Sequence, residues 1–251
     1  MKVAIIIAGE PRFCKEFDLF IDGLKGYTHV DWYFYLWKNS HAHPSIGNEL
    51  VSPNWNNFND EWALEKIKGN LPSNHSIRKF VIADQNNFNF NLNVNLSRIG
   101  WMCRPDGIWK QWRALKEADL MRRDQDYDLV IRTRNDMGVT PELDLKNIMS
   151  VLENNPKIVV MPKNNWFGGA NDLFAVSSAK NMETYFNLVD YIEEYHMQHG
   201  CIYQSEALLA HHLKYHELIS IPGEFETPLR SLGKWRAFPE GPYWSNFGRW
   251  E

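Results

Sequence analysis

Short apolar runs alternate along the chain with segments in which apolar residues recur every three or four positions. The apolar runs predict strands at 3–8, 31–37, 78–83, 129–133, 157–161 and 173–176. The periodic segments predict helices at 17–24, 61–68, 108–119, 179–194 and 204–215, the third with Asp106 as its N-cap. Strands separated by helices favour an α/β fold, with a Rossmann-like, mostly parallel sheet flanked by helices.

Three stretches interrupt this pattern. Residues 38–59 and 84–97 are polar and rich in Asn, and we expect loops there. The final stretch, 223–251, mixes Gly and Pro with aromatic and basic residues and shows no periodicity, so we expect an irregular tail packed on a single domain, 1–222. Aromatic rings and guanidinium groups suit sugar faces and phosphates, but the Trp residues could equally serve only to anchor the tail.

Composition narrows the class of partner. The formal net charge of −4 shows no basic excess, which argues against a dedicated nucleic-acid binder and favours a small substrate. Cys14, Cys103 and Cys201 are widely spaced, and we expect reduced thiols. No apolar run approaches the roughly 20 residues of a membrane span, so we expect no transmembrane segment and a cytoplasmic protein.

The predicted strand at 129–133 leads directly into a charged segment. Arg132, Arg134 and Asp136 alternate along the chain, so an extended backbone points them to one face. Ligands of open α/β sheets bind at the carboxyl ends of the strands. The pattern therefore predicts a site for polyphosphate and a metal ion, although an Arg–Asp pair that merely closes the strand end would give the same sequence.

Two glycine-containing loops are further candidates. Gly9, in the sequence Gly9-Glu10-Pro11-Arg12, follows the first predicted strand and would allow a nucleotide to approach the backbone, with Arg12 contacting its diphosphate. A simple turn is the alternative.

The second loop has the sequence WFGGANDLF, from Trp166 to Phe174. Gly168 and Gly169 would let the backbone approach a sugar, Trp166 offers a stacking face, and Asn171 and Asp172 supply groups for hydroxyls. A glycine turn before a strand, with Asp172 capping locally, is the alternative.

Taken together, these segments resemble GT-A-type glycosyltransferases of the kind found in bacterial and viral glycan clusters. The resemblance rests on AGEPRF after the first strand, YLW at the end of the second, the helix containing Gln111, RTRND, and WFGGANDLFAVSS, and it covers roughly residues 1–220. It implies a nucleotide-diphosphate sugar as donor, a glycan or other hydroxyl acceptor, and Mn²⁺ or Mg²⁺ held by a DxD motif.

The resemblance also implies roles for individual residues. Asp136 and His211 would hold the metal, His211 standing for the late His that some of these enzymes use, and Asp172 or Glu206 would be the catalytic base of an inverting transfer. The implied donor-binding residues are Gly9, Glu10, Arg12, Gln111, Arg132, Arg134, Gly168 and Gly169. Both residues also have an ordinary alternative. His211 could be a surface or core histidine without a ligand, and Glu206 could simply stabilise the first turn of its helix.

The chain departs from the DxD pattern at one position. Arg134-Asn135-Asp136 stands where DxD would, so one carboxylate is left. Asp136 could bind a cation shared with the diphosphate, or Arg134 could contact phosphate directly and reduce the need for metal. We therefore expect a metal-assisted glycosyltransferase, and the alternative is a non-catalytic nucleotide-sugar or glycan binder on the same fold.

Overall fold

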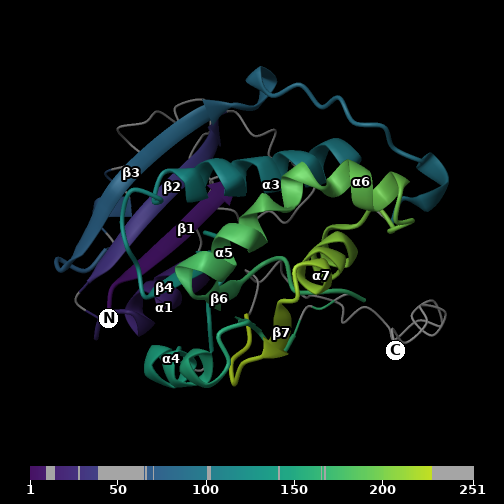
Figure 1. Ribbon diagram of the computed structural model, residues 1–251. Coiled ribbons are helices and arrows are strands. Elements are labelled where there is room, and N and C mark those ends of the chain that lie inside the picture. The colour runs from purple at the N-terminus through teal and green to yellow at the C-terminus, as the bar shows by residue number, and fades with distance from the viewer. Residues whose placement is uncertain are drawn as a thin grey trace.

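A computed structural model describes residues 1–9, 15–27, 29–38, 65, 67–69, 71–100, 103–140, 142–164, 166 and 168–227. The strands of this part form one mixed sheet in the order β3-β2-β1-β4-β6-β5-β7 (Figure 1). Their bounds are Val3–Gly9 (β1), Val30–Lys38 (β2), His75–Asp84 (β3), Leu129–Thr133 (β4), Ile158–Met161 (β5), Ala175–Ser177 (β6) and Ile219–Pro222 (β7).

The expected α/β class is confirmed, with the sheet mostly parallel. Strand β1 pairs in parallel with β2 and β4, β2 with β3, and β5 with β7. Strand β6 is the exception, because it runs antiparallel to both β4 and β5. The carboxyl ends of β1 and β4 consequently lie at the same edge of the sheet.

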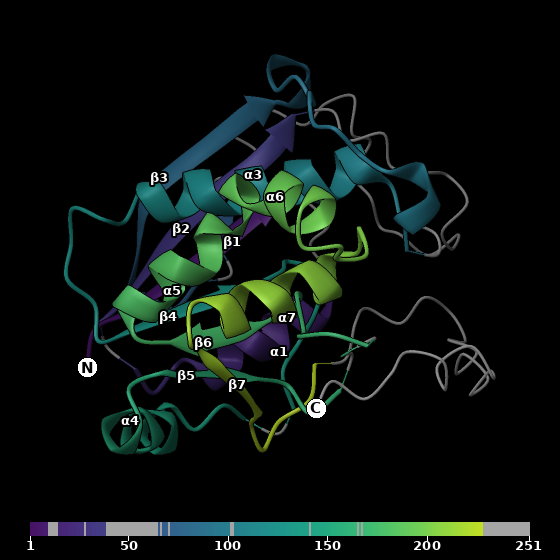
Figure 2. The same cartoon turned by 45° about the vertical axis from the view of Figure 1, so that its right-hand side comes forward.

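Helices cover both faces of the sheet. The buried residues of α1 (Lys15–Gly23) and α4 (Leu145–Asn154) pack with β1 and β4 side chains on one face. On the other face lie α3 (Pro105–Leu120), α5 (Ala179–Phe186) and α7 (Ser205–Tyr215) (Figures 1 and 2).

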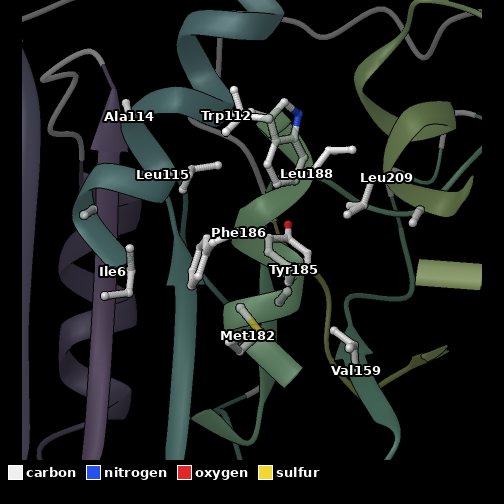
Figure 3. Close-up of a cluster of buried hydrophobic side chains, with 14 of the residues drawn as sticks. Ile6, Trp112, Ala114, Leu115, Val159, Met182, Tyr185, Phe186, Leu188 and Leu209 are labelled. Atoms are coloured by element: carbon white, nitrogen blue, oxygen red, sulfur yellow. The ribbon is translucent and has the colours of Figure 1, made fainter. Parts of the chain in front are cut away.

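A core cluster joins the helices of this second face. Figure 3 shows Trp112 of α3, Tyr185 of α5 and Leu209 of α7 directed toward one another, with Leu188 beside them. Trp112 also donates from Nε1 to Ser205 Oγ at 2.9 Å, a buried hydrogen bond that ties α3 to the first turn of α7. The core thus fixes where α7 begins.

Several sequence expectations need correction. Helix α3 begins at Pro105 with Arg104 as N-cap, since proline favours the first helical position, so Asp106 lies inside the first turn. The helix expected at 179–194 is divided into α5, a 3₁₀ turn at Asn187–Asp190, and α6 (Ile192–Met197). Helix α4 and strand β7 were not predicted.

The irregular stretches are described only in part. Within 84–97 the chain makes 3₁₀ turns at Gln85–Asn87 and Leu96–Arg98, and the tail begins with Phe225 packed in the core. Residues 39–59 and 228–251 lie outside the described residues, as do the sites expected at Glu10 and Arg12. In the described part of the chain, no helix has the length and apolarity needed to cross a membrane.

Buried His212 makes the packing of α5, α6 and α7 sensitive to acid. Its Nε2 lies 2.7 Å from the Thr184 carbonyl oxygen and its Nδ1 lies 2.9 Å from the Tyr195 hydroxyl, so Nε2 donates and Nδ1 accepts in the neutral ring. Burial is the main reason that the pKa of His212 falls from 6.5 to about 4.

We predict that stability falls as the pH drops from about 6.5 to about 4, because the unfolded chain binds a proton that the folded His212 resists. The contribution at stake is on the order of 3 kcal/mol. Denaturant melts at pH 7 and pH 5 check this. His212→Gln should reduce the loss of unfolding free energy between pH 7 and pH 5, whereas His29→Gln, at an exposed position, should leave that loss unchanged. An equal loss in the wild type and both variants would contradict the prediction.

Candidate active site

The charged segment after β4 begins inside the protein. Val130 packs with the α3 and α5 side, while Leu129 and Ile131 pack with the α1 and α4 side. Because side chains alternate along a strand, Arg132 points the same way as Val130, toward α3 and α5. Its side chain is 2% exposed, and its Nε and Nη1 have no hydrogen-bond partner among the described residues.

Arg134 and Asp136 form an ion pair at the strand end. Arg134 Nε and Nη2 each lie 2.7 Å from an oxygen of Asp136, one on Oδ1 and the other on Oδ2. The Arg134 side chain is 26% exposed, whereas that of Asp136 is 7% exposed. The Arg–Asp pair that the sequence also allowed is therefore present, and the Arg134 side chain is partly exposed.

This arrangement does not fit a metal held by protein side chains alone. A guanidinium occupies both carboxylate oxygens of Asp136, where a cation would have to bind. The described residues gather no group of three or more His, Cys, Asp or Glu that could hold a metal ion. The metal role expected for Asp136 stays a prediction.

His211 lies in a different environment, on α7. Its Nε2 is 2.9 Å from Nδ1 of His199, and its ring contacts Tyr195 and Tyr215. Burial, followed by the neighbouring His199, lowers the pKa of His211. These contacts are typical of a histidine packed among aromatic rings, and its metal role also stays a prediction.

The glycine loop fits against the start of α7. A Cβ on Gly169 would lie 2.2 Å from the backbone carbonyl carbon and oxygen of Glu206, closer than real Cβ atoms approach. Next to it, the Ala170 amide donates to the Glu206 carbonyl oxygen at 3.0 Å, and Gly168 adopts a φ of 79°. Gly169 therefore serves loop–helix packing in this structure, whereas the sequence suggested close approach of a sugar.

Two other residues of the loop have structural partners. Asn171 is buried, accepts from the amides of Leu173 and Phe174, and donates to the Asn164 carbonyl oxygen. Trp166 donates from Nε1 to the Pro162 carbonyl oxygen at 2.7 Å. The polar groups of the Asn171 side chain are thus engaged in contacts that shape the turn before β6, whereas the sequence suggested that they bind sugar hydroxyls.

Asp172 is directed to the face where α3 and α7 meet. It is 5% exposed, and its Oδ2 accepts from Gln111 Nε2 of α3 at 2.9 Å. Asp172 and Glu206 are close enough for their charges to interact. Burial first, and then the charge of Asp172, raise the pKa of Glu206 from 4.5 to about 7. The structure thus brings both expected catalytic carboxylates together.

Cys103 is a site residue that the sequence did not indicate. Burial and the nearby charges of Glu206 and Asp172 raise the pKa of its thiol to about 11. The segment containing it is held against the start of α7, because the Gly100 amide donates to the Tyr203 carbonyl oxygen at 3.1 Å and Ile99 pairs with Tyr203. A thiol with this pKa is protonated, and so uncharged, at neutral pH.

Gly9 ends β1 at the same edge. Its φ of 108° is a conformation that glycine adopts readily, and among the described residues a Cβ there would meet nothing within 4 Å. Ile7 pairs with Thr133, so Gly9 lies alongside the turn that carries Arg134. The binding role expected for Gly9 stays a prediction.

Comparison with known proteins finds matches among solved structures. The chain resembles the glycosyltransferase GlyE of Streptococcus pneumoniae TIGR4 at 13% identity, with a TM-score of 0.45 over 88% of this chain and 45% of that chain. It resembles the apo form of GlyE at 15% identity and the same TM-score and coverage, and an active-site mutant of LgtC at 12% identity and a TM-score of 0.42, over 86% of this chain and 70% of that one. GlyE is a glycosyltransferase.

The chain spans less than half the length of GlyE. No protein-family model and no curated protein matches it. At these identities and TM-scores the likeness assigns neither activity nor substrate, which must be argued from the residues of the site.

We predict that Gly169→Ala destabilises the protein by about 1–3 kcal/mol, the usual cost of overpacking, because the new methyl group would displace the Glu206 backbone. Gly107→Ala is a matched control in the first turns of α3, where the added Cβ lies 3.7 Å from its nearest neighbour. It should stabilise the protein by about 0.5–1 kcal/mol. Urea melts measure both, and a neutral Gly169→Ala would contradict the packing role.

Proposed function

We propose that this protein is a glycosyltransferase that moves a sugar from a nucleoside-diphosphate donor to a hydroxyl acceptor. The observation that carries the proposal is the pairing of buried Asp172 with half-buried Glu206 at the carboxyl-end edge of a mostly parallel sheet. Two neighbouring carboxylates with different partners suit proton transfer to one and binding by the other. The GT-A resemblance of the sequence supports the same class of reaction.

We propose that the donor diphosphate binds at the ends of β1 and β4. Arg134 has a partly exposed side chain at this edge, and no described residue lies within 4 Å of a Cβ built on Gly9. A guanidinium fork matches the oxygens of a phosphate group and keeps its charge at every accessible pH. In this proposal the anomeric carbon of the donor lies near the Asp172 loop.

Glu206 is proposed as the general base. A base works best when its pKa lies near the working pH, and the pKa of Glu206, about 7, meets this condition. As the acceptor oxygen attacks the anomeric carbon, its proton passes to Glu206, the carbon–oxygen bond to the diphosphate breaks, and nucleoside diphosphate leaves. This displacement inverts the anomeric configuration, so the stereochemistry of the product reports on the role of Glu206.

Asp172 is proposed to bind the sugar. Gln111 donates to one of its oxygens, which fixes the carboxylate and leaves Oδ1 to accept from a sugar hydroxyl. A divalent cation with the diphosphate stays a prediction from the sequence, and no step of this reaction is routed through one. The same site without turnover would make the protein a nucleotide-sugar binder, which would show saturable donor affinity and no release of nucleoside diphosphate.

We predict that Glu206→Gln lowers kcat by about 10²–10⁴-fold with a smaller change in KM, since it removes the proton acceptor and keeps the shape. Asp172→Asn should raise KM for the donor. Release of nucleoside diphosphate from a panel of nucleotide sugars, with a mixed glycan acceptor, measures both. Glu153→Gln, on an exposed position of α4, is the control, and full activity of Glu206→Gln would remove this residue from the mechanism.

The rate should also depend on pH. Because Glu206 must be deprotonated to act, kcat/KM should fall as the pH drops below about 7. In Asp172→Asn the repulsion between the two carboxylates is gone, so the acid limb should move to lower pH. An acid limb that stays in place in this variant would contradict the coupling.

Chelation distinguishes the two ways in which the end of β4 could bind the diphosphate, through a cation at Asp136 or directly through Arg134. The Arg134–Asp136 pair predicts that turnover persists in EDTA, whereas Arg134→Ala should weaken donor binding at least tenfold. Loss of turnover in EDTA with recovery in Mn²⁺ would instead support the cation at Asp136. Release of nucleoside diphosphate from the donor, with and without EDTA, measures turnover, and equilibrium binding of nucleoside diphosphates measures the effect of Arg134→Ala.

A further inference from the structure

The segment between β3 and α3 has a regular pattern that packing alone does not explain. Over residues 88–95 the sequence is FNFNLNVN, in which apolar residues alternate with Asn. The structure follows this alternation, because Asn89, Asn91 and Asn93 are exposed, whereas the apolar residues between them are partly buried. The segment belongs to no helix or strand and runs from the end of β3 toward α6 (Figures 1 and 2). We call residues 88–95 the Asn strip.

Apolar side chains hold the Asn strip on the body of the protein. The ring of Phe88 packs against that of Trp37 in β2, with centroids 5.3 Å apart. The ring of Phe90 packs against that of Trp109 in α3, with centroids 6.2 Å apart. Leu92 packs on the core cluster beneath α3, α5 and α7. The exposed Asn side chains are therefore carried by an anchored backbone.

Hydrogen bonds fix the far end of the Asn strip to α6. The Asn95 backbone amide donates to Nε2 of His196 at 2.9 Å. Asn93 donates from Nδ2 to Oε1 of Glu193 at 2.6 Å. These two Asn residues thus have structural partners, which explains their place in the sequence.

Asn89 and Asn91 have no such explanation. Their side chains are exposed and have no hydrogen-bond partner among the described residues. Asn is disfavoured in extended chain, and charged side chains ordinarily cover an exposed extended edge, yet no charged residue occurs between Asp84 and Arg98. An Asn amide both donates and accepts hydrogen bonds. Such a row suits a partner rich in hydroxyl groups, which also donate and accept, and carries no charge for an ionic partner.

The Asn strip leads to the candidate active site. After the 3₁₀ turn at Leu96–Arg98, the Tyr203 amide donates to the Arg98 carbonyl oxygen at 2.8 Å, and the Gly100 amide donates to the Tyr203 carbonyl oxygen at 3.1 Å. Tyr203 lies two residues before α7, whose first turn carries Glu206. A chain molecule bound along the strip would therefore have one end directed toward the proposed general base.

We propose that the Asn strip binds the acceptor, and that the acceptor is a neutral glycan chain in an extended conformation. The side-chain amides of Asn89 and Asn91 hydrogen-bond to hydroxyl groups along this chain, while its terminal sugar lies at Glu206. The role in acceptor binding rests on the proposed function, whereas glycan binding itself requires no turnover.

NMR titrations of the free protein with maltohexaose, cellohexaose and chitohexaose test the binding directly. At least one of these neutral chains should shift the side-chain amide signals of Asn89 and Asn91. The double variant Asn89→Ala/Asn91→Ala should bind that chain about 4–100-fold more weakly, since each lost hydrogen bond contributes a factor of roughly 2–10. Asn147→Ala, at an exposed position of α4 on the other face of the sheet, is the matched control and should leave the affinity unchanged.

Two results of these titrations would overturn the proposal. One is the absence of a shift at Asn89 and Asn91 with all three chains at millimolar concentration. The other is binding that the double variant leaves unchanged, because the partner would then use other groups, as a peptide paired with the strip backbone would.

Acceptor kinetics connect the Asn strip to turnover. In Asn89→Ala/Asn91→Ala, the KM for the hexasaccharide that binds should rise by the same factor as its Kd, while kcat, the KM for the donor and the KM for a monosaccharide acceptor stay unchanged. An equal rise of KM for monosaccharide and hexasaccharide would overturn the role in acceptor binding. Glycan binding without sugar transfer by the wild type would defeat the proposed function and leave the strip standing as a glycan site.

Discussion

The approach of the glycine loop to the first turn of α7 is the constraint on which the candidate site depends. Because Gly169 has no side chain, the loop backbone lies against the Glu206 carbonyl and the Ala170 amide bonds to it. That contact sets the separation of the Asp172 and Glu206 side chains. The core fixes the helix in turn, since Trp112 of α3 bonds to Ser205. A rigid scaffold thus holds the two carboxylates close together, although their like charges repel each other.

The electrostatics of the site follow from this enforced proximity. Burial and mutual repulsion raise the pKa of Glu206, while Gln111 of α3 donates to Asp172. The two carboxylates therefore differ in partners, and the difference suits one to exchange a proton and the other to bind. Cys103 lies close enough for both carboxylates to raise its pKa, and it is an uncharged thiol at neutral pH. The chemistry that we propose is a consequence of where the sheet, α3 and α7 place these groups.

Local patterns were sufficient for much of the fold. The apolar runs located β1, β2 and β4 closely, and the recurrence of apolar residues every three or four positions located α3 and α7, because burial on one or both faces leaves a direct trace in sequence. Helix α4 had a usable signal that was missed, with Asp144 capping and Leu145, Ile148 and Leu152 buried. Strand β7 had little, since it is short and partly exposed. The reversed direction of β6 depends on long-range pairing that no local pattern encodes.

The candidate site was predictable as a set of residues and not as an arrangement. Asp172 and Glu206 were recognisable as acids in promising places, but their coupling, the packing role of Gly169 and the Arg134–Asp136 pair arise from contacts between segments.

The most direct test of the account is a ¹³C NMR titration of the Glu206 side-chain carboxyl in the free protein. We predict a midpoint near 7 in the wild type and a lower midpoint in Asp172→Asn that stays above 4.5, because burial, the larger cause of the shift, remains. A midpoint near 4.5 in the wild type, or an unchanged midpoint in Asp172→Asn, would contradict the account.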